Sequence, residues 1–436
     1  MRLTIINQFY TPDISPTAHL AASLAAHRAS LGDEVTVVAS RGGYVAASAD
    51  AASERRANLR NPRVYRIWTP RLGKGNVIKR CIDYGTFYGL ALWRMLRLPG
   101  QDVIISLTTP PYIAYAAVAH RLLHPRRTRL VLWNMDCYPD AAERMRVIRA
   151  GGLLSRFLRW LNRRLFARID HLVCLDTAMM DLLVSQYAPP ARRRALPATV
   201  IPNWEPAELF PAGDVAAPWR KADELGLAGR FVVLYLGNTG YGHQFETVLD
   251  AAALLAGEPV TFLFVGGGQR WKWLADEVAA RRLANVVMHG YVPKDETAAV
   301  MAAADCALIT LRDDALGVMS PSKLHANLAM GLPVIYIGPP GSNVDDAIRA
   351  HDCGRAFAHG EVDAVVDFIR SLMNDEPSRH AYRRRARSAF EAAYCDARAL
   401  PRFDEVIESL YGEAGAAKAG AARRRGGESE DANAIA

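Results

Sequence analysis

The chain has 436 residues, of which 50% are hydrophobic and 22% are charged, and its formal net charge is +8 at pH 7. This composition is that of a globular protein long enough for two domains of about 200 residues each. It excludes a membrane-spanning helix, because no apolar run reaches about 18 residues. The nearest run, Val103 to Ala119, is interrupted by Pro110 and Pro111. The start, Met1 to Ile6, has a strand pattern and predicts no signal peptide.

The cysteines and the charge distribution narrow the class of protein further. The six cysteines form no CxxC pair and mostly adjoin apolar segments, which predicts buried, reduced thiols in a cytosolic protein. Residues 1–205 carry 29 Lys/Arg and 14 Asp/Glu, whereas residues 206–436 carry 24 and 31. A basic N-terminal half suits nucleic acid, anionic lipid or a polyphosphate as binding partner. The cysteines are Cys81, Cys137, Cys174, Cys306, Cys353 and Cys395.

In the first half of the chain, apolar strand-like runs alternate with helical stretches. A helix is predicted over Thr17–Leu31, ended by Gly32. Strands that alternate with helices predict a parallel sheet covered on both faces. The predicted strands are Leu3–Asn7, Glu34–Ala39, Val103–Leu107, Leu130–Asn134 and His171–Leu175.

The same pattern restarts after a Pro-containing connection, Thr199–Glu205. We therefore predict an α/β protein with one parallel-sheet domain over residues 1–205 and another over 206–395, with a ligand cleft at their strand ends. A last helix is expected over 396–411, followed by a disordered tail over 412–436. The second set of strands is Phe231–Leu236, Val260–Val265, Val286–His289, Cys306–Thr310 and Val334–Ile337.

The stretch from Ser320 to Gly331 predicts an anion site. Ser320 is an N-cap type of residue, Pro321 suits the first helical position, and Ser322 and Lys323 then fall in the first turn. A lysine beside the unpaired N–H groups of a helix start is suited to a phosphate or diphosphate. The alternative is an ordinary surface helix with a solvated lysine.

Two glycine-rich loops follow strands of the second unit. Gly237 to Gly242 closes its first strand, and Gly266 to Gly268 closes the next. Glycines there permit close approach of a ligand, although tight turns would use them equally. His243 and His325 are candidates for the cleft by position, or structural hydrogen bonders.

Two aspartates of the first unit follow strands and are candidates for acid–base chemistry. Asp136 ends the strand Leu130–Asn134, and Asp13 lies in the loop after the first strand. A general base would sit at such a position, and so would a helix-capping or turn aspartate. Asp313 and Asp314 have no third ligand at sensible spacing, so we interpret them as loop residues rather than a metal pair.

Two stretches of the first half are basic and rich in apolar or aromatic residues. They are Lys79–Arg97 and Leu153–Arg168, and the second places leucines and a phenylalanine on one helical face with arginines off it. Basic amphipathic helices bind anionic membranes. The alternative is a core-facing stripe with solvated arginines.

Five segments of the chain occur in a specific order and spacing: FYTPDISPTAHLAASLA, IPNW, LGNTGYGHQFETVLDAA, FVGGG and PSKLHANLAMGLPVI. Together they resemble the retaining glycosyltransferases of family 4, which have the GT-B fold. The resemblance covers residues 1–395 and is closest to the O-antigen, capsule and exopolysaccharide branch, which includes N-acetyl-L-fucosamine transferases. It implies a UDP-sugar donor in the second domain and a polyprenyl-diphosphate-linked saccharide acceptor in the first, at the anionic inner face of the plasma membrane. It also implies a cytoplasmic, peripheral enzyme that needs no metal, other cofactor or nucleic acid.

The resemblance also implies roles for particular residues. Lys323 would be catalytic by stabilising the leaving diphosphate, and Asp136 and Asp13 would orient the acceptor. The last helices would cross back onto the first domain. The residues expected around the donor are Gly237, Asn238, Gly240, His243, Gly266, Gly267, Ser320, Pro321, Ser322, Lys323, His325 and Asn327.

The chain departs from the family pattern at two glutamate positions and after the Gly–Asn loop. Many members carry two glutamates eight positions apart, where this chain has Val318 and Ala326. Asn327 and His325 are candidates for the lost ribose contact, and His243 for a basic residue missing after the Gly–Asn loop. Two alternatives stay open: a UDP-sugar epimerase of the same architecture, and a non-catalytic nucleotide-sugar-binding subunit of a polysaccharide assembly complex. The lack of a dinucleotide fingerprint after the first strand argues against a dehydrogenase.

Overall fold

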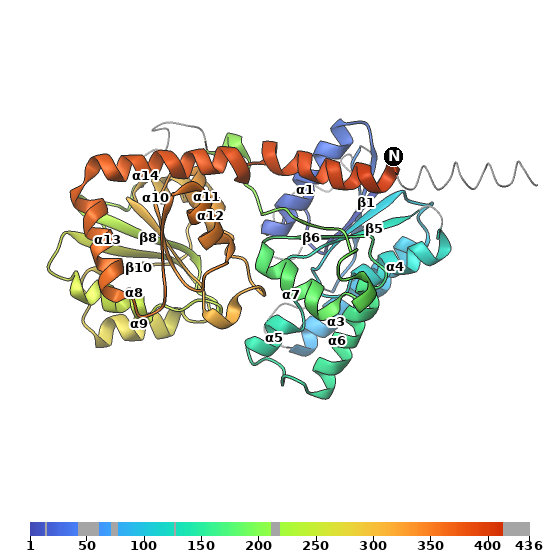
Figure 1. Ribbon diagram of the computed structural model, residues 1–436, viewed down its shortest axis with the longest axis horizontal. Helices are drawn as coiled ribbons and strands as arrows, with labels where there is room; N and C mark the ends of the chain where they lie inside the picture. The colour runs from blue at the N-terminus through green and yellow to red at the C-terminus, as the bar shows by residue number, and fades with distance from the viewer. Residues whose placement is uncertain (14, 42–60, 71–76, 126–127, 211–218, 413–436) are drawn as a thin grey trace, which may run out of the picture.

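The computed structural model describes residues 1–13, 15–41, 61–70, 77–125, 128–210 and 219–412. Two α/β units lie side by side, and the last helices run along one edge of both (Figure 1). The predicted fold class is confirmed, because each unit is built on an all-parallel sheet. The tail predicted for 412–436 lies outside the described residues except for Gly412, which ends the last helix.

The N-terminal unit contains a seven-stranded sheet in the order β3-β2-β1-β4-β5-β6-β7. Its central strands are continuous apolar runs, such as VIISL in β4, and every residue of β4 is buried, because helices cover both faces of a parallel sheet. The strands are β1 (Arg2–Ile6), β2 (Glu34–Ser40), β3 (Arg63–Ile67), β4 (Val103–Leu107), β5 (Arg129–Trp133), β6 (His171–Cys174) and β7 (Ala198–Val200). The helices are α1 (Pro16–Ser30), α3 (Val77–Leu96), α4 (Ala114–Leu123), α5 (Asp140–Arg144), α6 (Leu153–Phe166) and α7 (Thr177–Tyr187).

The C-terminal unit contains a six-stranded sheet in the order β10-β9-β8-β11-β12-β13. Here too the chain crosses over at the centre of the sheet, between β8 and β11, and such switch points are where open α/β sheets bind ligands. The strands are β8 (Phe231–Asn238), β9 (Val260–Gly267), β10 (Val286–His289), β11 (Cys306–Thr310), β12 (Val334–Ile337) and β13 (Gly354–Phe357). The helices are α8 (Glu246–Leu254), α9 (Trp271–Ala280), α10 (Thr297–Ala302), α11 (Lys323–Ala329), α12 (Asn343–His351), α13 (Val362–Asn374) and α14 (Glu376–Ala389).

A π-helical turn (Phe390–Tyr394) and a helix over 396–412 return the chain to the N-terminal unit (Figure 1). Phe403 of that helix packs on Trp133 of β5, with ring centroids 4.5 Å apart, and Trp133 stacks on Trp204 of the connecting segment at 5.6 Å. Arg28 of α1, only 4% exposed, donates to Asp404 over 2.7 Å. A buried guanidinium needs such partners, so the last helix completes the N-terminal core.

Some predicted features of the fold need correction or addition. The sequence pattern does not predict β3, β7 or β13, which lie away from the centre of their sheets. The five cysteines whose side chains are described are buried and unpaired, and the side chain of Cys81 is outside that set. Among the described helices, none is long and apolar enough to cross a membrane.

Candidate functional site

The carboxyl ends of β8 and β9 are packed against each other without room for side chains. A Cβ on Gly266 would lie 2.1 Å from the carbonyl oxygen of Gly237, and a Cβ on Gly268 would lie 2.0 Å from Oδ1 of Asn238. Gly266 and Gly268 also have positive φ angles of 143° and 130°, which side chains disfavour. The amide of Thr239 donates to the carbonyl of Gly267 over 2.7 Å and ties the two loops together. The glycines therefore serve close packing of two strand ends.

Lys323 reaches across this strand end from the start of α11. A Cβ on Gly237 would lie 3.0 Å from Cε of Lys323, so the glycine makes the space through which the lysine passes. Nζ of Lys323 donates to the carbonyl of Asn238 over 3.3 Å and lies 4.8 Å from the ring centre of Tyr235. The structure thus brings Gly237, Asn238 and Lys323 together, as the sequence predicted for one side of a ligand site.

His243 holds the same ammonium group. Its Nδ1 lies 2.6 Å from the carbonyl oxygen of Thr310, which places the ring proton on Nδ1 and leaves Nε2 as an acceptor. Nζ of Lys323 lies 3.1 Å from that Nε2. Burial and the Lys323 charge lower the pKa of His243 to about 3, so the ring stays neutral. His243 orients the lysine and adds no positive charge to the site.

Burial lowers the pKa of Lys323 to about 7. The lysine is therefore close to half-protonated at neutral pH, unlike an ordinary solvated lysine. An anion that binds beside it would favour the ammonium form and raise the pKa again. A half-buried lysine with a perturbed pKa at the end of a strand is typical of a functional group that meets negative charge.

The start of α11 differs from the prediction. The helix begins at Lys323, its N-cap is Ser322, and no side-chain cap is formed there. Ser320 is not the N-cap, because its hydroxyl is hydrogen-bonded to the carboxyl of Asp176 in the N-terminal unit. The carbonyl of Pro321 accepts a hydrogen bond from Nδ2 of Asn343 over 3.2 Å. The lysine itself, rather than a capped first turn, is the main polar group that this segment presents.

The two candidates for a ribose contact lie on different sides of α11. His325 is two residues from Lys323 and therefore faces roughly away from it, whereas Asn327, four residues on, shares its face. Nδ1 of His325 lies 3.1 Å from the carbonyl of Ser322, and its ring is 5.4 Å from that of Tyr394. Burial lowers its pKa to about 4. His325 is thus a neutral interior residue, and the structure does not bring it to the lysine.

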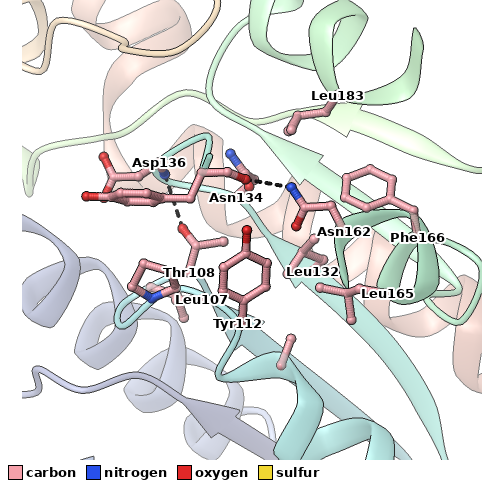
Figure 2. Close-up of a pocket in the computed structure, with 13 residues that line it drawn as sticks. Leu107, Thr108, Tyr112, Leu132, Asn134, Asp136, Asn162, Leu165, Phe166 and Leu183 are labelled. Carbon is pink, nitrogen blue, oxygen red and sulfur yellow. Dashed lines mark hydrogen bonds between the residues drawn. The ribbon is translucent and has the colours of Figure 1, made fainter. Parts of the chain in front are cut away.

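Asp136 lies at a separate pocket, in the N-terminal unit, beyond the ends of β4 and β5 (Figure 2). Its backbone N–H donates to Oγ1 of Thr108 over 3.1 Å. Asp136 is exposed at the edge of this pocket, and desolvation by the protein around its carboxyl group raises its pKa. A carboxylate with a raised pKa at the edge of a pocket is suited to accept a proton or to hold a hydroxyl group. Other lining residues include Tyr112, Asn134, Asn162, Leu165 and Phe166.

Asp13 has a local role in its own turn. Its carboxylate accepts a hydrogen bond from the backbone N–H of Tyr10 over 3.4 Å, and its amide donates to the Tyr10 carbonyl over 3.1 Å. The residue is 7% exposed. This geometry matches the turn-forming alternative considered for Asp13. Asp313 and Asp314 begin a short 3-10 turn (Asp313–Ala315) in the connection between β11 and α11, and Asp314 pairs with Arg312 over 2.7 Å.

Two residues at the glycine loops were not singled out by the sequence analysis. Tyr291 follows β10, is 67% exposed, and its ring would meet a Cβ on Gly267 at 2.7 Å. Arg270 follows the second glycine loop, donates to the carbonyl of His243 over 2.9 Å and stacks on Trp273 at 4.0 Å. Both residues could have been found from the sequence, because each is an aromatic or basic residue that closely follows the end of a predicted strand or its loop.

The two halves of the chain match two family models. Residues 17–204 match the glycosyl transferase 4-like domain, and residues 219–389 match the glycosyl transferases group 1. Among curated relatives, the probable glycosyltransferase WbjE of Pseudomonas aeruginosa is 26% identical over 324 residues. The alignment spans 72% of this chain and 75% of WbjE.

Solved structures share the same architecture. HepE of Anabaena, in complex with UDP and glucose, has a TM-score of 0.65 at 14% identity, over 94% of this chain and 100% of HepE. WaaG, a glycosyltransferase involved in lipopolysaccharide biosynthesis, has a TM-score of 0.61 at 17% identity, over 94% of this chain and 99% of WaaG. With the two family matches, these findings identify the chain as a group 1 glycosyltransferase with the two-domain GT-B fold.

Proposed function

We propose that this glycosyltransferase moves a sugar, with retention, from a UDP-sugar to a saccharide carried on polyprenyl diphosphate in bacterial surface polysaccharide biosynthesis. The observation that carries the proposal is Lys323, whose Nζ lies 3.3 Å from the Asn238 carbonyl at a glycine-lined strand end. The donor diphosphate would lie against this ammonium and the amides of the Gly237–Gly242 loop. Ser320 and Ser322 precede the lysine and complete the proposed donor side, and no metal is expected.

The proposed reaction follows from the charge that develops on the donor. The bond between the anomeric carbon and the diphosphate oxygen breaks, and Lys323 stabilises the negative charge on the leaving group. The acceptor hydroxyl attacks the anomeric carbon from the same face, and its proton passes to the leaving phosphate oxygen. Asp136, an exposed residue at the edge of the N-terminal pocket, would orient the acceptor. Asp13 would support the neighbouring loop rather than touch substrate.

Two observations support a uridine nucleotide as the donor's carrier. HepE, which shares the fold, was solved with UDP bound. In this chain the exposed ring of Tyr291 lies against Gly267, beside the loops that would hold the diphosphate. An aromatic face in that position can stack a base, and such stacking is worth about 1–3 kcal/mol in nucleic-acid-binding proteins.

The proposed lipid-linked acceptor fits an apolar, basic surface on the N-terminal unit, which we call the α3–α6 face. Helix α4 packs against both α3 and α6, so the three helices form one layer. Arg97 lies 4.0 Å from the ring of Trp93, and Arg164 lies 5.5 Å from that of Trp160. Exposed apolar side chains beside arginines suit the anionic inner face of the plasma membrane, on its cytoplasmic side. The exposed apolar residues include Leu90, Trp93, Leu96, Leu153, Leu154, Phe157 and Trp160.

A thermal-shift panel of nucleotides and UDP-sugars tests the donor site. A ligand at about a hundredfold excess over its Kd stabilises the folded state by about 2.7 kcal/mol, so the wild-type melting temperature should rise with UDP and one UDP-sugar. Lys323→Ala should abolish that rise. Lys272→Ala removes a lysine that is 86% exposed on α9 and should respond like the wild type. The absence of any nucleotide response in the wild type would contradict the proposal.

The loss of both family glutamates favours a second candidate, a non-catalytic nucleotide-sugar-binding subunit. Val318 and Ala326 cannot supply carboxylate contacts to the donor. Turnover assays with the best-binding UDP-sugar separate the possibilities. Product that forms only with acceptor supports transfer, product without acceptor supports the epimerase alternative, and binding without product supports the subunit.

A further inference from the structure

Residues 313–320 belong to the C-terminal unit by sequence, between β11 and α11, but they contact the N-terminal unit. Nη1 of Arg144, the last residue of α5, donates to the carbonyls of Asp314 over 3.0 Å and Leu316 over 2.6 Å. Sγ of Cys137 lies 3.3 Å from the carbonyl oxygen of Gly317. Three backbone carbonyl groups of this segment therefore accept hydrogen bonds from side chains of the other unit.

Gly317 and Val318 are the closest points of this contact. Gly317 has a φ angle of 76°, and a Cβ there would lie 2.9 Å from the carbonyl oxygen of Ala178 on α7. Val318 is 1% exposed and belongs to the apolar core of the N-terminal unit rather than to that of its own. A carboxylate could not occupy this position without losing its water.

The contact ends next to the proposed diphosphate site. The hydroxyl of Ser320 is hydrogen-bonded to the carboxyl of Asp176, which is 3% exposed and caps α7 through a 2.7 Å bond from the amide of Met179. Lys323 follows three residues later. The segment thus links helices of the N-terminal unit to the residues that position the lysine.

We infer that the 313–320 segment is a positioning element that holds the Ser320–Lys323 end of the donor site in register with the acceptor-binding unit. Val318 is its anchor, at a place where many members of the family carry a glutamate that contacts donor. The affinity for the donor therefore depends on the contacts between residues 313–320 and the N-terminal unit, although none of these contacts involves the donor itself. This inference rests on the proposed function, since the diphosphate is the ligand whose affinity is coupled.

Arg144→Ala tests the inference from the far side of the contact, because Arg144 belongs to the N-terminal unit and its partners are backbone carbonyls. Coupling energies between sites correspond to about 5- to 150-fold in affinity, and we expect UDP to bind roughly tenfold more weakly. Arg149→Ala, which removes the same charge from an exposed position nearby, should leave UDP affinity unchanged. Isothermal titration calorimetry measures the UDP affinity of the wild type, of Arg144→Ala and of Arg149→Ala.

Val318→Glu gives a second, independent variant from within the segment. We expect a similar or larger loss of UDP affinity, and faster amide hydrogen exchange over residues 313–323 and in Thr177–Leu182. Circular dichroism and thermal unfolding show whether each variant is folded. If folded Arg144→Ala and Val318→Glu proteins bind UDP as tightly as the wild type, the inference is wrong.

The experiment also separates this inference from the proposed function. If the wild type itself does not bind UDP, the proposed donor site fails. The positioning role is then decided by hydrogen exchange in Arg144→Ala alone. Faster exchange over residues 313–323 than in Arg149→Ala would support a structural link between the units, and equal exchange in the two variants would overturn it.

Discussion

At the end of the C-terminal sheet, a lysine is held by a backbone carbonyl and a neutral histidine, over glycines that leave no space around them. At the end of the N-terminal sheet, Asp136 lies over a pocket lined by side chains, and the outer helices expose apolar groups and arginines. The first end is rigid and fixed by the backbone, which suits a constant group such as a diphosphate. The second is made of side chains, which suits an acceptor whose structure differs between pathways.

The charges of the two units sharpen this contrast. Residues 206–436 carry an excess of acidic residues, with 24 Lys/Arg against 31 Asp/Glu, yet the proposed anion site lies there. One lysine, placed where water is scarce, decides the local potential more than the summed charge of the domain. In the N-terminal unit, Arg97 and Arg164 instead lie exposed beside tryptophan rings, where they can act on an anionic membrane.

The largest expected effect comes from filling the gap between β8 and β9. In Gly266→Ala the new Cβ would lie 2.1 Å from the Gly237 carbonyl, at a φ angle of 143°. We expect the free energy of unfolding to fall by about 3 kcal/mol and the UDP response to be lost. Urea unfolding measures the stability. Gly257→Ala, where a Cβ would meet nothing within 4 Å, is the matched control. Equal stability of the two variants would show that the strand end is not rigid.

The next effect concerns the pH dependence of donor binding. The pKa of Lys323 is lowered to about 7 in the free protein, and an anion raises it. Above pH 7 the free lysine loses its proton, so UDP binding must take one up, and Kd should rise by about tenfold per pH unit. Calorimetry in two buffers of different ionisation enthalpy measures the proton uptake directly. Lys323→Arg keeps its charge and should give a flat profile, and a flat wild-type profile would rule out the lowered pKa.

The sequence predicted central strands better than peripheral ones, and the reason lies in their surroundings. Cys306–Thr310 and Val334–Ile337 were predicted with the bounds that the structure shows, because both are fully buried apolar runs. β3 (Arg63–Ile67) reads RVYRI and is mostly half-buried, since it lies at the edge of its sheet. An edge strand has no continuous apolar run to signal it.

The candidate site was predictable in its residue types but not in its pairings. Glycines after strands and a lysine after Ser–Pro are local signals, and the structure brings these residues together at the end of β8. The bond between Lys323 and His243 joins residues 80 positions apart. Ser320 has the residue type of an N-cap, but Asp176 of the other unit takes its hydroxyl. Local propensity cannot anticipate such tertiary competition.

The smallest expected effect tests the other side of the comparison, the α3–α6 face. Leu154 on α6 and Leu254 on α8 are both 55% exposed, so they form a matched pair on the two units. Leu154→Glu removes apolar area and adds a charge that an anionic surface repels, which together should weaken binding to vesicles roughly fivefold to tenfold. Leu254→Glu should change nothing. Co-sedimentation with vesicles of phosphatidylglycerol and phosphatidylethanolamine measures both variants. If the two variants bind alike, the N-terminal unit has no special role at the membrane. If Leu154→Glu instead changes the oligomeric state in gel filtration, the α3–α6 face contacts a second copy of the chain.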